Sequence, residues 1–160
     1  MADREAVLAG RLAVTDLPRI VAAVVSHGDD ISVNMRFYRD AEGYCVADGS
    51  ARAEVELICQ RCLKPVQLVL DAHFKLAAVD DDKAAAALPD RYDALLCRDG
   101  EVAAAEMIED ELLLALPIIA MHADMNECGK SAALLKETQV TEDAGKPESP
   151  FAVLKDLKRH

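Results

Sequence analysis

The stretch Ala51-Arg-Ala-Glu-Val-Glu-Leu-Ile-Cys-Gln-Arg-Cys62 and its continuation Val66-Gln-Leu-Val-Leu-Asp-Ala-His-Phe-Lys-Leu76 alternate between apolar and polar side chains. A period of two is typical of strands that bury one face and expose the other. A turn of a few residues separates the two segments, and a turn this short joins antiparallel neighbours. We therefore predict two antiparallel strands with Cys59 and Cys62 at the turn between them.

A third strand precedes this pair. Residues 31–38 alternate in the same way, and Arg39-Asp-Ala-Glu-Gly43 supplies a turn into the long extended stretch that ends at Cys59. Gly49 lies within that stretch and indicates a bulge or bend. Three consecutive strands with short turns predict an antiparallel meander with one buried face, which could curl toward a barrel.

Two segments have helical character. Residues 17–25 are compatible with a helix that Asp16 caps, with Pro18 in its first turn. Residues 101–116 show the clearest amphipathic pattern, and Pro117 stops it. Its apolar stripe consists of Val102, Ala105, Ile108, Leu112 and Leu116. Between the sheet and this helix, residues 92–97 suit a short further strand.

The fold class is therefore α+β, with an antiparallel sheet packed by one long helix. At 160 residues, of which 52% are apolar, the chain is long enough for one good-sized core. We assign residues 1–135 to that single domain. Residues 136–149 have almost no large apolar side chains and predict a flexible acidic linker. Residues 150–160 predict a short C-terminal docking helix that carries Phe151, Leu154 and Leu157.

The formal charge of -11 opposes broad adsorption to nucleic acid or to anionic lipid, because each neutralised phosphate needs a nearby Lys or Arg. The start of the chain does not resemble a signal peptide. The longest apolar run, residues 112–121, is broken by proline and too short to cross a bilayer. We expect a cytoplasmic protein with no membrane partner.

The five cysteines are an odd number in a chain without an export signal, which disfavours a disulfide framework. Zinc requires about four converging thiolate or imidazole ligands. Cys59 and Cys62 have the spacing of one half-site, and His122 and Cys128 are the candidates for the other half. Two alternatives remain open: packed thiols that bind nothing, and a redox pair, which the flanking strands disfavour.

The sequence offers no catalytic constellation. It lacks a Gly-rich phosphate loop, since its seven glycines are scattered singly, and no base and nucleophile are recognisably paired. We therefore predict a protein that is not an enzyme.

Two kinds of charged surface could contact a partner. Arg61 and Lys64 at the cysteine turn, with Lys158 and Arg159 near the C-terminus, are the local basic features. The helix at residues 101–116 is instead acidic, and a solvated acidic face that suits the helix dipole is its simplest interpretation. The alternative is a docking face for a basic partner, with Glu106, Glu109 and Asp110 as candidate contacts.

Three segments together resemble the YceD family, also called the DUF177 domain family. They are Glu56-Leu-Ile-Cys-Gln-Arg-Cys-Leu63, Met107-Ile-Glu-Asp-Glu-Leu-Leu-Leu-Ala-Leu-Pro117 and Pro150-Phe-Ala-Val-Leu-Lys-Asp-Leu-Lys158. Many relatives carry a run of further cysteines after the Leu-Pro, and this chain departs from that pattern in keeping His122 and Cys128 there. The departure leaves zinc binding open.

The resemblance implies a bacterial or organellar factor that supports the accumulation of large-subunit (23S) ribosomal RNA and large-subunit assembly, with no established enzymatic activity. Two routes fit such a role. The protein could act on a pre-ribosomal large-subunit particle through its small basic patches, or it could be an acidic escort that holds a basic ribosomal protein. A zinc-knuckle binding module is a further alternative.

Overall fold

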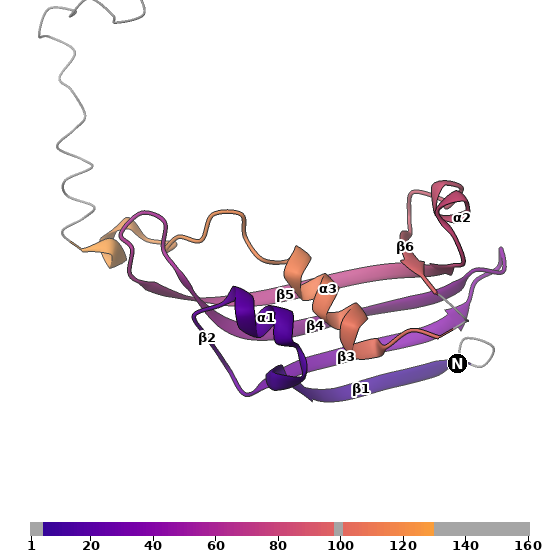
Figure 1. Cartoon of the computed structure of the whole chain (residues 1–160), viewed down its shortest axis with the longest axis horizontal. Helices are drawn as coiled ribbons and strands as arrows, with labels where there is room; N and C mark the ends of the chain where they lie inside the picture. Colours follow the sequence, from indigo (N-terminus) through magenta and orange to yellow (C-terminus); the bar gives the residue numbers. More distant parts are fainter. Residues whose placement is uncertain (1–4, 98–100, 130–160) are drawn as a thin grey trace, which may run out of the picture.

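The computed structural model describes residues 5–97 and 101–129. The predicted meander is present and forms the centre of the sheet (Figure 1). Its antiparallel strands are β3 (Asp30–Arg39), β4 (Cys45–Ile58) and β5 (Pro65–Val79). Three shorter strands extend it: β1 (Ala6–Ala13), β2 (Ser26–His27) and β6 (Asp93–Leu96). The main order is β1-β3-β4-β5-β6, with β2 paired to β4.

The register places alternate residues of the meander on one buried face, as the alternation in the sequence predicts. Val33 lies opposite Ala51, and Ala51 lies opposite Ala72, and all three side chains are buried. Pairing continues through Gly49, which lies between Met35 and Phe74 with no extra residue. The predicted bulge at Gly49 is therefore wrong. A Cβ at this position would lie 2.6 Å from the Cβ of Met35, so glycine is required by close approach.

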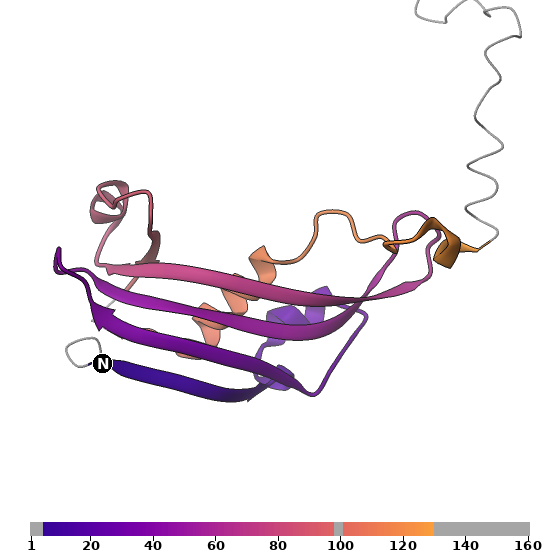
Figure 2. The same cartoon turned by 180° about the vertical axis from the view of Figure 1, so that it is seen from behind.

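One face of the sheet is covered by helices and the other is not (Figures 1 and 2). The covering elements are η1 (Val14–Asp16), α1 (Pro18–Ala23) and α3 (Ala104–Leu114). Helix α3 is shorter than the predicted span of residues 101–116. It begins after Ala103, which offers no side-chain cap, and it ends before Pro117 disfavours helical backbone.

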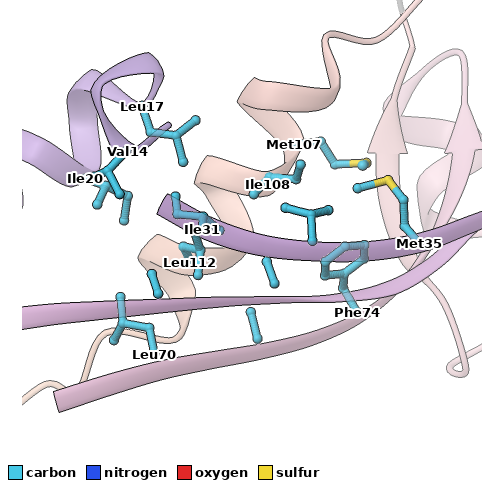
Figure 3. Packing of buried hydrophobic residues seen from close by; sticks show 14 of the residues in the cluster. Val14, Leu17, Ile20, Ile31, Met35, Leu70, Phe74, Met107, Ile108 and Leu112 are labelled. Atoms are coloured by element: carbon cyan, nitrogen blue, oxygen red, sulfur yellow. The ribbon is translucent and has the colours of Figure 1, made fainter. Parts of the chain in front are cut away.

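The main core lies between these helices and the sheet (Figure 3). Ile20 of α1, Ile31 of β3 and Leu112 of α3 are fully buried, and Leu70 and Phe74 of β5 pack in the same cluster. Each such side chain contributes about 1.5–3 kcal/mol through burial. The stripe predicted for α3 is correct at Ile108 and Leu112, which face this core.

The described sheet is open, because β1 and β6 stand at opposite ends of the strand order. This part of the chain does not close into a barrel, and α1 and α3 cover the apolar face of the sheet instead. Sequence alternation did not reveal β1, which pairs antiparallel with β3, or the parallel pairing of β6 with β5. A short helix, α2 (Asp82–Ala86), connects β5 to β6. The predicted linker and the predicted C-terminal helix lie outside the described residues, and the domain boundary at residue 135 stays a prediction.

Helix α1 is capped from a distant part of the chain. Asp16 was expected to cap it, but the N-cap is Leu17, which has no side-chain acceptor. The Glu109 carboxylate of α3 takes that role instead, because its Oε1 accepts from the backbone N–H of Arg19 (2.6 Å) and of Ile20 (3.2 Å). The Arg19 Nε–H also donates to Glu109 Oε2 at 2.6 Å. These bonds join α1 to α3 over the sheet.

Candidate metal centre

The turn between β4 and β5 is held in a tight knuckle. The Cys59 N–H donates to the Lys64 carbonyl, and the Leu63 N–H donates to the Cys59 carbonyl, both at 2.9 Å. Leu63 has a φ of 59°, in the left-handed region that glycine normally occupies. No glycine follows Cys62 in the sequence, and Leu63 itself adopts the backbone conformation that the knuckle requires.

The chain returns to this turn after α3. The Gln60 N–H donates to the Ala120 carbonyl at 2.8 Å, which places the segment beside the knuckle. A short 3-10 helix, η2 (Met125–Cys128), follows; its N-cap Asp124 accepts from the Asn126 N–H. This helix ends with Cys128 buried at the same end of the sheet, where Figure 1 shows η2 beside the β4–β5 turn.

Four candidate ligands meet at this point. The ligand atoms of Cys59, Cys62, His122 and Cys128 all lie within 4.8 Å of one another. The His122 Nδ1 is 3.5 Å from the Cys62 Sγ and 3.7 Å from the Cys128 Sγ. Tetrahedral zinc with ordinary Zn–S and Zn–N bonds requires ligand separations of about 3.5 to 3.8 Å. The donor set and its spacing thus fit a four-coordinate metal ion.

The local hydrogen bonds favour the thiolate form of Cys59 but not that of Cys128. Burial by itself would raise the pKa of the Cys59 thiol. The backbone N–H groups of Cys62, His122 and Arg61 point at the Cys59 sulfur and, with the His122 side chain, lower its pKa to about 5. The Cys128 thiol behaves oppositely, because burial and the neighbouring Cys62 sulfur raise its pKa. A metal ligand must be deprotonated, and the lowered pKa of Cys59 favours its thiolate.

Arg61 supports the cluster from its side. Its Nε–H donates to the Cys128 Sγ at 3.1 Å, and its Nη2–H donates to the His122 carbonyl at 2.7 Å. Groups that hydrogen-bond to ligands in this way orient them and tune the site. The sequence suggests Arg61 as a contact for RNA or a partner, whereas the structure directs its guanidinium inward.

The cluster has the character of a structural rather than a catalytic metal site. Four protein donors complete a tetrahedron and leave no position for substrate or water. Cys59 and Cys128 are fully buried, while Cys62 and His122 are half-buried. Strands β4 and β5 flank the Cys59–Cys62 pair on both sides, so neither thiol begins a helix as a thioredoxin-type pair requires.

The remaining predicted contact residues are dispersed. Lys64 is exposed at the knuckle, and Glu106 is exposed on α3. Glu109 is buried in its bonds to α1, and Asp110 Oδ1 accepts from Arg19 Nη1 at 2.6 Å. Lys158 and Arg159 lie outside the described residues. Sequence reasoning missed Arg19, the partner of both carboxylates, and no local pattern signals a pairing over some ninety positions.

This combination of an open, helix-covered sheet and a cluster of sulfur and nitrogen donors defines the described part of the chain as a small α+β protein whose cluster could hold a metal ion. Within the described ranges, no helix is both long and apolar enough to span a membrane.

Comparison with known proteins identifies the family. The family model described as "Large ribosomal RNA subunit accumulation protein YceD" matches residues 47–158. A Haemophilus influenzae protein of the same name is 33% identical over 159 residues, which cover 99% of this chain and 91% of that protein. The chain belongs to the YceD family. No solved structure matches it.

Proposed function

We propose that this protein supports the accumulation of large-subunit ribosomal RNA in the cytoplasm, as a binding factor and not as an enzyme. The observation that carries the proposal is its membership of the YceD family over nearly the whole chain. The family is described by its effect on ribosomal RNA and not by a reaction. The closed donor set of the cysteine cluster agrees with a structural role for that site.

Zinc is the metal that we assign to Cys59, Cys62, His122 and Cys128. Three thiols and one imidazole are a common structural zinc set, and softer ligands of this kind disfavour magnesium and calcium. Bound zinc would join the β4–β5 turn to the segment that follows α3. It would thereby fix the shape of this end of the molecule, which we call the cysteine end (residues 58–65 and 118–129).

The cysteine end is also the surface that we assign to the pre-ribosomal large-subunit particle. Several of its apolar side chains are exposed: Leu63 is 74% exposed, Ile118 fully exposed, and Ile119 and Met121 about half exposed. The Lys64 side chain extends from the same turn. Exposed apolar side chains near a cation suit a protein–RNA particle better than bare RNA, which an overall charge of -11 would repel.

Sedimentation of a cell lysate at low and moderate salt tests this function. We expect the wild-type protein to migrate with precursor large-subunit particles, and Leu63→Asp and Lys64→Glu to shift it toward the top of the gradient. Lys83→Glu is the matched control, since Lys83 is an exposed lysine of α2 and should not matter. Equal migration of Lys64→Glu, Leu63→Asp and the control would contradict the assigned surface.

An acidic escort of a basic ribosomal protein is the second candidate, and the net charge of -11 is the observation that favours it. On this route the protein would stay at the top of the gradient with one basic partner. Its association with purified basic ribosomal proteins would weaken steeply as salt rises. Migration of the protein alone under all conditions would contradict both routes.

A further inference from the structure

A groove separates β6 from α3 on the helix-covered side of the sheet. Its volume is about 560 Å³, within the range of pockets that hold ligands or side chains. Its apolar lining comes from Leu76 of β5, Leu95 of β6 and Met107 of α3, together with Leu113 and Leu114. The groove therefore offers an apolar floor close to the surface.

Among the described residues, the polar lining of the groove is acidic. Asp93, Asp110 and Glu111 contribute carboxylates, and no Lys or Arg of the described ranges lines the groove. Arg19 of α1 pairs with Asp110 of α3, but neither Asp93 nor Glu111 forms an ion pair among the described residues. Burial, followed by the charges of Asp93 and Asp110, raises the pKa of Glu111. An occupant with apolar side chains and flanking cations would relieve this repulsion.

The chain itself contains such a segment. Residues 150–160 read Pro-Phe-Ala-Val-Leu-Lys-Asp-Leu-Lys-Arg-His, with Phe151, Leu154 and Leu157 at intervals of three. Spacing of this kind places apolar side chains along one side of a helix. The same segment has three Lys or Arg residues, at positions 155, 158 and 159, and one acidic residue. Its pattern complements both the floor and the rim of the groove.

The connection is long enough. From Gly129 to Pro150 the chain advances 21 residues (150 minus 129), which reach at most about 70 Å when extended. Strand β5, which runs along the sheet from the cysteine end, has 15 residues and is about 50 Å long. The extended reach exceeds the length of β5, so residues 150–160 can reach the groove.

We propose that the C-terminal segment, residues 150–160, docks into the groove between β6 and α3 of its own chain. Phe151, Leu154 and Leu157 contact the apolar floor, and Lys155 and Lys158 face Asp93 and Glu111. This contact would return the end of the chain to the domain. It would also cover an acidic surface that could otherwise bind a basic partner. The proposal does not depend on the ribosomal function.

Methyl NMR of the full-length protein tests the docking, because both methionines belong to the main core but only Met107 also lines the groove, whereas Met35 does not. We expect the pair Lys155→Glu and Lys158→Glu to shift the Met107 methyl signal and to make the amides of residues 151–157 as mobile as the linker. The Met35 signal should stay in place. Lys136→Glu with Lys146→Glu makes the same charge change in the linker and should leave Met107 unchanged.

A reciprocal change separates docking from a general charge effect. Asp93→Lys with Glu111→Lys should release the same segment in the otherwise wild-type chain. Three results would overturn the proposal. The first is a Met107 signal that responds equally to both pairs of lysine substitutions, or to neither pair. The second is that the amides of residues 151–157 are already mobile in the wild type. The third is a shift of the Met107 signal that depends on protein concentration. The last would identify a second copy as the occupant.

Discussion

The guanidinium of Arg61 links two candidate ligands without being a ligand itself. It bonds the Cys128 sulfur and the carbonyl of His122, so it fixes the second half of the site relative to the first. We expect Arg61→Ala to weaken zinc affinity about 10- to 100-fold, the usual effect of removing a group that orients metal ligands. Competition with a chromophoric zinc chelator measures this affinity.

Lys64→Ala is the matched control for Arg61→Ala, since Lys64 is a neighbouring cation whose side chain is exposed. It should bind zinc like the wild type. Equal affinity of the Arg61→Ala variant and this control would mean that Arg61 has no role at the cluster. Loss of binding in both would instead indicate that the charge of the turn, and not the specific bonds of Arg61, is what matters.

The residues of the cluster differ in how far the sequence alone predicts their place in the site. Cys59 and Cys62 were predictable because a pair at this spacing in a turn has few uses, and His122 and Cys128 followed as the nearest donors after the acidic helix. The inward direction of the Arg61 guanidinium was not predictable, because a long cation at a turn is usually solvated. The backbone conformation of Leu63 was not predictable either. Its left-handed backbone costs about 1–2 kcal/mol and is adopted only because the surrounding bonds require it.

At the scale of elements, the contact between α1 and α3 depends on Glu109. Helix α1 has six residues and would be marginal alone, so its stability comes from packing and from the cap that Glu109 provides. We expect Glu109→Gln to destabilise the protein by about 1–3 kcal/mol, because hydrogen bonds that a charged carboxylate accepts are replaced by weaker ones to a neutral amide. Glu106→Gln, on the exposed side of the same helix, should change stability by less than about 0.5 kcal/mol.

The same carboxylate makes part of the stability depend on pH. Burial raises the pKa of Glu109, but the bonds from Arg19 and Ile20 outweigh it and lower that pKa below its ordinary value of 4.5. Because the pKa is lowered in the folded state, the contribution of Glu109 to the free energy of unfolding is complete above the ordinary pKa and is lost as pH falls below it. Urea unfolding at neutral pH and at about pH 3.5 should therefore show a smaller difference between wild type and Glu109→Gln in acid. An unchanged difference would contradict this role.

The elements themselves were predictable to different extents. Strands β3, β4 and β5 follow from alternation, since a period of two has one physical interpretation over so many residues. Strand β1 did not stand out, because at the sheet edge most of its side chains are exposed on both faces and no alternation is selected. The cap of α1 could not be predicted from the local sequence, because Glu109 reaches α1 only in the tertiary fold.

At the scale of the molecule, the described residues form three buried clusters, and two of them bear on the role of the metal site. The main core lies between the helices and the sheet, whereas a small cluster surrounds Cys59 and Cys128 at the cysteine end. Among the described residues, the small cluster has only Val66 and Ala120 as further buried members. Apolar burial of this size stabilises little on its own, so a metal is the natural means of holding this end together.

Metal removal should therefore have a local effect. We expect chelation of zinc from the full-length protein to accelerate amide hydrogen exchange in residues 58–66 and 118–129, because these segments lose the ion that links them. Exchange in β3 and α3 should change little, since their burial in the main core does not involve the cluster. Hydrogen exchange measured by mass spectrometry before and after chelation gives both quantities. Cys97→Ser, which changes a cysteine outside the cluster, should respond to chelation as the wild type does. Acceleration across the whole sheet would mean that the main core and the cluster at the cysteine end form one cooperative unit, and no acceleration anywhere would mean that the protein holds no structural metal.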